Sequence, residues 1–269
     1  MRQVRLGTAF VWAFTLVLVS TPVHAQETKA AASNPDIEEK AMAILKRMAE
    51  FLSQAQRFSV TLDIGFDAVQ DSGQKIEFGE TRKIVLRRPD HLRMEETKRD
   101  GSKSELIFDG KDVTVLHAKE NVYATMARAG TLDEAIAYFI TDLNMRLPLA
   151  QLLSSNLAKA LPAQVRVADY VEESSIAGVP CDHLALRGDQ ADLQVWVAQG
   201  KQPLPQRVVV TYKREDGRPQ FWAQFSDWNL APEAPDSVFT FTPPAGATKI
   251  AFSPRQMMQP GAAETKGGQ

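Results

Sequence analysis

The chain has 269 residues, with 31 Lys and Arg against 33 Asp and Glu and a formal net charge of −2. This balance excludes the strongly basic composition of a nucleic-acid-binding protein, so nucleic acid is not an expected partner. The single cysteine, Cys181, excludes an internal disulfide framework. We interpret it as a small buried hydrophobic residue rather than as a reactive thiol paired with His183, which shares its strand face.

The N-terminus has the features of an export signal. Two arginines precede an apolar run from Leu6 to Val19, and Val23-His24-Ala25 fits a cleavage site with small residues at its first and third positions. The apolar run is shorter than the about 20 residues of a membrane-spanning helix. We therefore expect residues 1–25 to be a signal peptide that is cleaved after Ala25, which leaves an exported, soluble chain.

A helix is predicted near the start of the mature chain. Residues 26–33 are polar and rich in Ala and predict a short disordered lead, and the folded domain is expected over residues 34–252. Asn34-Pro35 is a favourable helix start, and a 3.6-residue apolar period predicts a helix over residues 35–56. The opposite face is charged, so this helix is expected to cover an apolar surface. Its inward-facing candidates are Ile44, Met48 and Phe51.

The apolar period changes to two after the helix, which indicates strands. Turn signals about every ten residues predict an antiparallel meander. The predicted strands cover residues 58–68, 75–87, 91–98, 105–108, 113–117, 121–126, 165–172, 181–187, 193–198, 207–213 and 221–228. A last strand is expected at Phe239–Thr242, ended by Pro243-Pro244. By closing against the first strand, it would make the sheet continuous.

Two helices are predicted to interrupt the meander within residues 131–161. Thr131-Leu-Asp-Glu134 is a capping box that begins the first helix, and an apolar stripe after Pro148 indicates the second. The candidates for a lid over the sheet are Ile136, Phe139, Ile140, Leu152 and Leu153. Residues 253–269 show no period and predict a disordered tail.

These elements predict a mainly β fold with added helices. A wide sheet with one apolar face must bury that face or close into a barrel, and the sequence offers three amphipathic helices but no second sheet. We therefore expect a strongly curved antiparallel sheet, an open and incomplete β-barrel, with helices plugging its concave face. Such curvature would leave an apolar space between the sheet and the helices.

The large apolar side chains of the strands have two interpretations, core packing or the lining of an open cavity. The cavity-lining candidates are Phe58, Val60, Leu62, Ile64, Phe66, Phe78, Trp196, Trp222 and Trp228. Trp222 and Trp228 are an even number of residues apart, so they face the same way in a strand without a bulge. The sequence does not show which strand face is concave.

No group of residues indicates catalysis or metal binding. His91, His117 and His183 lie alone on separate predicted strands, without the spacing of metal ligands. Ser154-Ser155 lacks the Gly-x-Ser-x-Gly pattern of a nucleophile elbow. We therefore expect a protein that is not an enzyme and that uses no metal ion or cofactor, with a hydrolase as the disfavoured alternative.

Several segments, in order along the chain, resemble a known family. They are Arg87-Arg-Pro-Asp-His-Leu-Arg93, Phe108-Asp-Gly-Lys-Asp-Val-Thr-Val115, Asn121-Val-Tyr123 and Phe239-Thr-Phe-Thr-Pro-Pro-Ala-Gly246. Together they resemble the LolA/LolB superfamily of bacterial periplasmic lipoprotein carriers, and most closely an uncharacterised family of predicted periplasmic proteins within it. Leu132-Asp-Glu-Ala and Leu147-Pro-Leu-Ala-Gln-Leu-Leu153 resemble the helical insert of that subfamily. The resemblance covers about residues 35–250.

The resemblance implies a fold and a function. The superfamily fold is an incomplete barrel whose helices form a lid over a hydrophobic cavity, in agreement with the sheet predicted above. Its carriers bind acyl chains of lipoproteins or other lipids without covalent chemistry. The implied partners are therefore a lipid or a lipidated protein and a membrane-bound donor or acceptor, and the implied protein is a periplasmic monomer.

The resemblance also implies one site residue and one alternative function. In the carriers, the arginine of an Arg-Pro pair bonds lid elements and holds the empty cavity shut, and Arg88, immediately before Pro89, matches it. The alternative for Arg88 is a surface arginine paired with a nearby acid. The alternative function is an envelope-stress sensor or interaction module of the same fold, of the RseB type.

Overall fold

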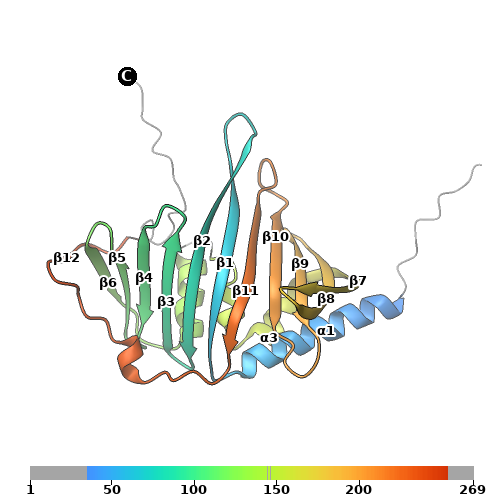
Figure 1. The fold of residues 1–269 in the computed structure, drawn as a ribbon, viewed down its shortest axis with the longest axis horizontal. Coiled ribbons are helices and arrows are strands. Elements are labelled where there is room, and N and C mark those ends of the chain that lie inside the picture. The colour runs from blue at the N-terminus through green and yellow to red at the C-terminus, as the bar shows by residue number, and fades with distance from the viewer. Residues whose placement is uncertain (1–34, 144, 146, 254–269) are drawn as a thin grey trace, which may run out of the picture. The chain divides into compact units, whose positions relative to one another are not determined.

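The computed structural model describes residues 35–143, 145 and 147–253, and its folded unit begins with helix α1 (Pro35–Gln54) (Figure 1). The expected signal peptide, the lead over residues 26–33 and the tail beyond Ser253 lie outside the described residues. None of the described helices is both long and apolar enough to span a membrane.

The described strands form one sheet. In chain order they are β1 (Arg57–Val69), β2 (Lys75–Arg87), β3 (His91–Lys98), β4 (Lys103–Phe108), β5 (Asp112–His117), β6 (Val122–Ala127), β7 (Val165–Ile176), β8 (Val179–Gly188), β9 (Ala191–Ala198), β10 (Pro205–Tyr212), β11 (Gln220–Asn229) and β12 (Thr248–Lys249). Their spatial order is β12-β6-β5-β4-β3-β2-β1-β11-β10-β9-β8-β7. The sheet ends at β12 and β7 without closing, so the predicted fold class, an open curved sheet with helices, is confirmed.

Strand β1 lies at the centre of the sheet, between β2 and β11. It pairs with β2 along its whole length, from Arg57 opposite Arg87 to Val69 opposite Lys75. Because side chains alternate between the faces of a strand, this register also decides which residues of the neighbouring strands meet on the inner face. The inner-face residues of β1 are Phe58, Val60, Leu62, Ile64 and Phe66.

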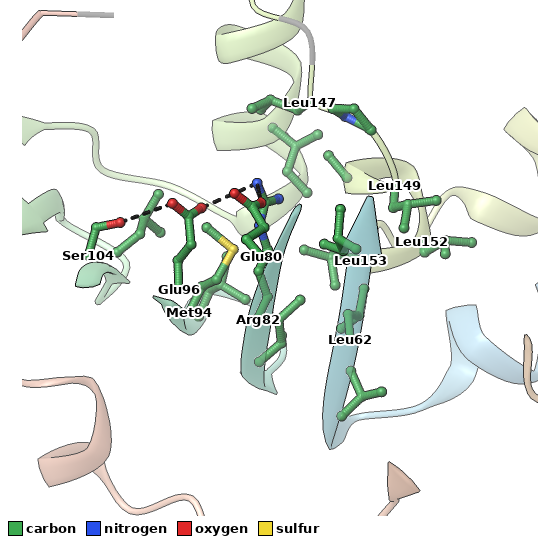
Figure 2. A pocket seen from close by; sticks show the side chains of 18 of the residues that line it. Leu62, Glu80, Arg82, Met94, Glu96, Ser104, Leu147, Leu149, Leu152 and Leu153 are labelled. Atoms are coloured by element: carbon green, nitrogen blue, oxygen red, sulfur yellow. Dashed lines mark hydrogen bonds and ion pairs between the residues drawn. The ribbon is translucent and has the colours of Figure 1, made fainter. Parts of the chain in front are cut away.

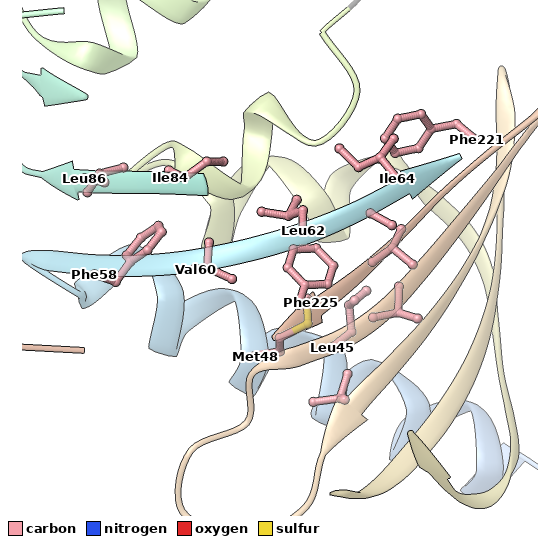
Figure 3. Close-up of a cluster of buried hydrophobic side chains, with 14 of the residues drawn as sticks. Leu45, Met48, Phe58, Val60, Leu62, Ile64, Ile84, Leu86, Phe221 and Phe225 are labelled. Carbon is pink, nitrogen blue, oxygen red and sulfur yellow. The ribbon is translucent and has the colours of Figure 1, made fainter. Parts of the chain in front are cut away.

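Helix α1 covers the inner face of the β11–β7 half of the sheet (Figure 1). Its apolar stripe is buried at Leu45, Met48 and Leu52, and Figure 3 shows Met48 beside Phe225 of β11. Burial of each such side chain contributes about 1.5–3 kcal/mol. At its other end the ammonium of Lys40 lies 3.4 Å from the ring centre of Tyr170 on β7. The helix is therefore an integral part of the hydrophobic core.

The expected insert contains four short helical segments. They are α2 (Leu132–Ala137), the π-helical turn η1 (Tyr138–Asp142), the 3-10 turn η2 (Ala150–Leu153) and α3 (Leu157–Gln164). The predicted capping box forms, since Thr131 N donates to Glu134 Oε2 at 2.7 Å and Glu134 N donates to Thr131 Oγ1 at 3.2 Å.

The single helix expected after Pro148 is divided in two, which corrects the prediction. Leu149 adopts a left-handed conformation (φ 67°), and Ser154 is extended. The adjacent Ser155 donates its backbone N–H, at 2.9 Å, and its hydroxyl to the carboxylate of Asp133 in α2. The backbone N–H of Ser155 is free for this hydrogen bond because the chain leaves the helical path at Ser154. The two bonds connect the two halves of the insert.

The expected closing strand at Phe239–Thr242 is wrong. Residues Asp236–Phe239 form a 3-10 turn, η3, and no strand follows before β12, which pairs with β6 at the opposite edge from β7. The neighbour of β1 is β11 instead. The ring of Phe239 is buried with Ile107 of β4 and Ala234, so this residue packs on the sheet without pairing as a strand. Pro243 and Pro244 have no N–H to donate to a strand ladder.

Three residues of the Arg87–Arg93 segment hold this C-terminal turn. Arg87 donates to the carbonyl of Ala234 at 2.8 Å and to Asp236 at 2.6 Å. Arg93 donates to the carbonyl of Val238 at 3.1 Å, and the ring of His91 meets that of Phe239 edge-on at 4.9 Å. Two segments that the sequence shows far apart are therefore one packed unit.

Candidate functional site

An apolar cavity of about 210 Å³ lies between the inner face of the sheet and the helical insert. Strands β1 to β5 and β11 supply one wall, and the segment from Leu132 to Leu153 supplies the other (Figure 2). In Figure 2, Leu147, Leu149, Leu152 and Leu153 face Leu62 and the neighbouring strand residues across this space. Apolar walls that face each other in this way fit an apolar ligand.

Most of the predicted lining and lid residues meet in this cavity. Those that line it are Phe58, Val60, Leu62, Ile64, Phe66, Trp228, Ile136, Phe139, Leu152 and Leu153. The remaining lid candidates lie elsewhere. Ile44 and Met48 are buried in the core under the sheet, and Phe51 packs beside Leu52 and Leu204. Ile140 is half-buried outside the lining.

Three predicted lining residues do not reach the cavity. Phe78 lies near the tip of the β1–β2 hairpin, is 41% exposed and stacks on Phe66 with ring centres 6.1 Å apart. Trp196 is stacked on His183 at 4.0 Å. Trp222 lies on the outer face over Gly65, where any side chain would collide with its indole, and donates to Glu77 at 3.1 Å.

A bulge separates Trp228 from Trp222. The pairing of β11 with β1 shifts between Ser59 and Thr61, and Asp227 has a positive φ of 53°. An extra residue in one strand reverses the side-chain alternation beyond it. Trp228 therefore points inward, where its ring stacks on Phe225 at 5.7 Å, while Trp222 points outward.

The cavity has one polar region, which the sequence analysis did not single out. Arg82 stands opposite Leu62 on β1 and opposite Glu96 on β3, and Glu96 stands opposite Ser104 on β4. Glu80 precedes Arg82 on the same face. All four line the cavity, and we call them the polar cluster (Figure 2). The signal in the sequence is that they occupy the same alternate positions as Ile84, Met94 and Leu106.

The polar cluster is closely bonded. One guanidinium nitrogen of Arg82, Nη2, contacts Glu80 Oε1 and lies 3.3 Å from Glu96 Oε2. Ser104 Oγ donates to Glu96 Oε1 at 3.2 Å. Glu80 is 4% exposed, and this burial raises the pKa of its carboxyl group, with Glu96 adding to the rise and Arg82 opposing it. Arg82 Nε is buried and has no hydrogen-bond partner among the described residues.

Arg88, the residue expected to act as a gate, lies outside the cavity lining. Its Nε donates to the carbonyl of Ala55, one residue beyond α1, at 3.0 Å, and its backbone N donates to the carbonyl of Gln56 at 2.8 Å. Burial lowers the pKa of its guanidinium, and the nearby carboxylate of Asp133 in α2 opposes that shift. Arg88 therefore stands between the end of α1 and the start of the insert.

The remaining chemically reactive side chains have structural contacts. Cys181 is buried, as predicted, and burial raises the pKa of its thiol. Its Sγ lies 3.2 Å from the carbonyl of Val179, while His183 Nε2 lies 3.1 Å from Gln194 Oε1. Across the described ranges, no group of three or more His, Cys, Asp or Glu residues could hold a metal ion.

The family model described as predicted periplasmic protein (DUF2092) matches residues 41–253. No curated protein matches the sequence at a significant level.

Solved structures with similar folds include the following three. The Mycobacterium tuberculosis lipoprotein LppX is 13% identical with a TM-score of 0.49, over 73% of this chain and 98% of that one. A LolA superfamily protein from Nitrosomonas europaea is 16% identical with a TM-score of 0.37, over 75% and 97%. MucB in the Pseudomonas aeruginosa MucA/MucB complex is 20% identical with a TM-score of 0.40, over 75% and 61%.

Proposed function

Because this chain belongs to that family of predicted periplasmic proteins, as its sequence motifs indicated, we propose that it is a non-enzymatic periplasmic protein that binds or carries a hydrophobic ligand. The ligand is a lipid or the acyl chain of a lipoprotein, held between the curved sheet and the helical insert. The observation that supports this proposal most strongly is the apolar cavity of about 210 Å³ between those two walls.

Hydrophobic burial supplies the affinity in this proposal. Each CH₂ group moved from water into the cavity contributes about 0.8 kcal/mol, so a long acyl chain binds without any covalent bond. No catalytic step is needed, because a carrier only takes up the chain and releases it again.

The movable wall in this proposal is the insert, Leu132 to Leu153, rather than α1. Residues of the insert line the cavity, whereas Leu45 and Leu52 of α1 are fully buried in the core. Hydrogen exchange tests this assignment. We expect the insert to exchange faster than the sheet and α1 without lipid, and to become protected when lipid is bound. Equal protection of all three with and without lipid would contradict it.

Native mass spectrometry of the protein purified from the periplasm tests the function itself. We expect a population with an added lipid mass, and lipid extraction then identifies the molecule. The test variant is Ile136→Trp. It places a larger side chain in the cavity wall and is expected to lower the lipid-bound fraction relative to the parent protein. A protein that carries no lipid under conditions where it is folded would contradict the proposal and favour an interaction module.

A further inference from the structure

The cavity changes from apolar to charged along the strands, as the register of β1 to β5 shows. Phe58 and Leu86 begin one row, and Val60 and Ile84 begin the next. Continued across β3, β4 and β5, both rows contain apolar side chains alone. The following row begins with Leu62 and continues with four polar residues, Arg82, Glu96, Ser104 and His117. It lies about 13 Å along the strands from the Phe58 row. The cavity is therefore amphipathic, with an apolar end and a polar end.

We propose that the polar cluster binds the uncharged, hydroxyl-bearing head group of an amphiphile, such as a glycerol or a sugar, while the acyl chain occupies the apolar rows. This inference rests on the proposed function, because it concerns the head of a ligand whose chain fills the same cavity. It adds a ligand class and a binding subsite made of Glu80, Arg82, Glu96 and Ser104.

The cluster is poorly explained by stability alone. Burying an ion pair removes two charges from water, and replacing such a pair with packed apolar residues is often neutral or stabilising. Glu80 is almost completely buried, and burial raises the pKa of its carboxyl group, so folding acts against its ionised form. The neighbouring rows show that apolar residues occupy equivalent positions, at Ile84 and Met94. A binding role supplies a reason for charged residues on this face.

The charges of the cluster select against an anionic head. Glu80 and Glu96 both contact the same guanidinium nitrogen of Arg82, so the positive charge there is already matched by two carboxylates. With Lys98, which follows on the same face and also lines the cavity, the formal charges of Glu80, Arg82, Glu96 and Lys98 sum to zero. Glu105 lines the cavity as well and adds a further negative charge. A phosphate or a free carboxylate would add a third negative group beside Glu80 and Glu96, and like charges in a poorly solvated site repel.

A hydroxyl group fits the same site. It can donate a hydrogen bond to a carboxylate oxygen of Glu80 or Glu96, or to Ser104 Oγ, and accept one from Arg82, without changing the net charge. Hydrogen bonds to charged groups contribute about 1.5–3 kcal/mol, more than neutral pairs. Figure 2 shows the polar cluster opposite Leu147, Leu149 and Leu153, so the insert would close over the head group.

Competition among ligands with one palmitoyl chain and different heads tests the inference. A fluorescent apolar probe is bound to the full-length mature protein and displaced by monopalmitoylglycerol, palmitate or palmitoyl lysophosphatidate, below their micellar concentrations. We expect monopalmitoylglycerol to bind about tenfold more tightly than either anion. Equal affinities for the three would overturn the inference and leave the proposed function standing. If none displaces the probe, both fail.

Variants assign the preference to the cluster. Glu96→Gln keeps the side-chain shape and removes one carboxylate. We therefore expect the affinities for palmitate and palmitoyl lysophosphatidate to rise by most of the tenfold difference from monopalmitoylglycerol. Ser104→Ala removes one hydroxyl and is expected to weaken monopalmitoylglycerol alone. The matched control is Glu120→Gln, at an exposed position outside the cavity. Thermal unfolding shows that each variant is folded. An unchanged preference in both folded cluster variants would overturn the inference.

Discussion

Arg88 Nε donates a hydrogen bond to the carbonyl oxygen of Ala55 at 3.0 Å and so joins the turn between β2 and β3 to the end of α1. Asp133 of α2 acts on the same guanidinium from the side of the insert. In addition, the backbone N–H of Leu132 donates to the carbonyl of Pro89 at 2.8 Å. One short segment therefore contacts both helical elements, which supports a proposed role for Arg88 in holding the insert closed.

Arg88→Leu removes this connection without entering the cavity. The substitution loses a charge-assisted hydrogen bond. It also removes the buried Nη2 of Arg88, which has no partner among the described residues, and this offsets part of the lost stability. We expect the free energy of unfolding to fall by about 1 kcal/mol and the apolar probe to bind and leave faster. Stopped-flow fluorescence measures the rates. Arg57→Leu, at an exposed position on β1, is the control, and identical kinetics in both variants would refute the gate.

Leu153→Trp tests the cavity from the side of the insert. Leu153 is half-buried and lines the cavity, so a larger ring at this position takes up space that an acyl chain would need. We expect the affinity for an apolar probe to fall by about tenfold, or about 1.4 kcal/mol. Phe78→Trp, at the exposed hairpin, is the control and should bind as the parent does. Loss of binding in both would point to a different site.

Glu80→Gln tests the buried carboxyl group through the pH dependence of stability. Burial raises the pKa of Glu80 above its ordinary value of 4.5 in the folded protein. The folded protein then binds the proton of this carboxyl group more tightly than the unfolded chain does. The resulting contribution to the free energy of unfolding is complete below the unfolded pKa and is lost as the pH rises through the folded pKa. We expect the parent to lose stability relative to Glu80→Gln from below 4.5 to neutral pH.

Urea unfolding of both proteins at several pH values measures this difference. Glu120→Gln serves as the control, because Glu120 is exposed and its replacement should leave the profile parallel to that of the parent. A difference between the parent and Glu80→Gln that is constant with pH would show that the carboxyl group has no raised pKa.

Phe239→Ala tests the C-terminal turn as a structural unit. The ring is 1% exposed, packs with Ile107 and Ala234 and meets His91 edge-on. Truncation leaves a cavity, so we expect the free energy of unfolding to fall by about 3–5 kcal/mol. Chemical denaturation provides the measurement, with Thr242→Ala at an exposed position as the control. A loss as small as that of the control would mean that the turn is not part of the folded core.

Local patterns were sufficient for much of the fold. The predicted strands over residues 75–87 and 91–98 have the bounds that the structure shows, because a two-residue apolar period and a turn specify both ends of each strand. The capping box at Thr131 was also predicted correctly. Phe239–Thr242 has the same alternation, yet it pairs with no strand, and only its two phenylalanines pack on other elements. Alternation alone does not distinguish a strand from an extended segment.

The site was predicted in part for the same reason. The inner face of β1, from Phe58 to Phe66, follows from alternation along one unbulged stretch. Trp228 points inward and Trp222 outward because of a bulge at Asp227, which no local sequence pattern indicated. The polar cluster is not evident from the sequence, because charged residues in a strand are ordinarily on its solvated face.

By itself, the sequence determined the periods of the helices and strands and the family of the chain, and it predicts export. Only the tertiary structure decided which residues share a space. The register of β1, β2, β3 and β4 brings Arg82, Glu96 and Ser104 together inside an apolar cavity, and the packing of the insert covers them. Strand pairing and packing join residues that are distant in sequence, and a one-residue shift would turn each of these side chains to the other face.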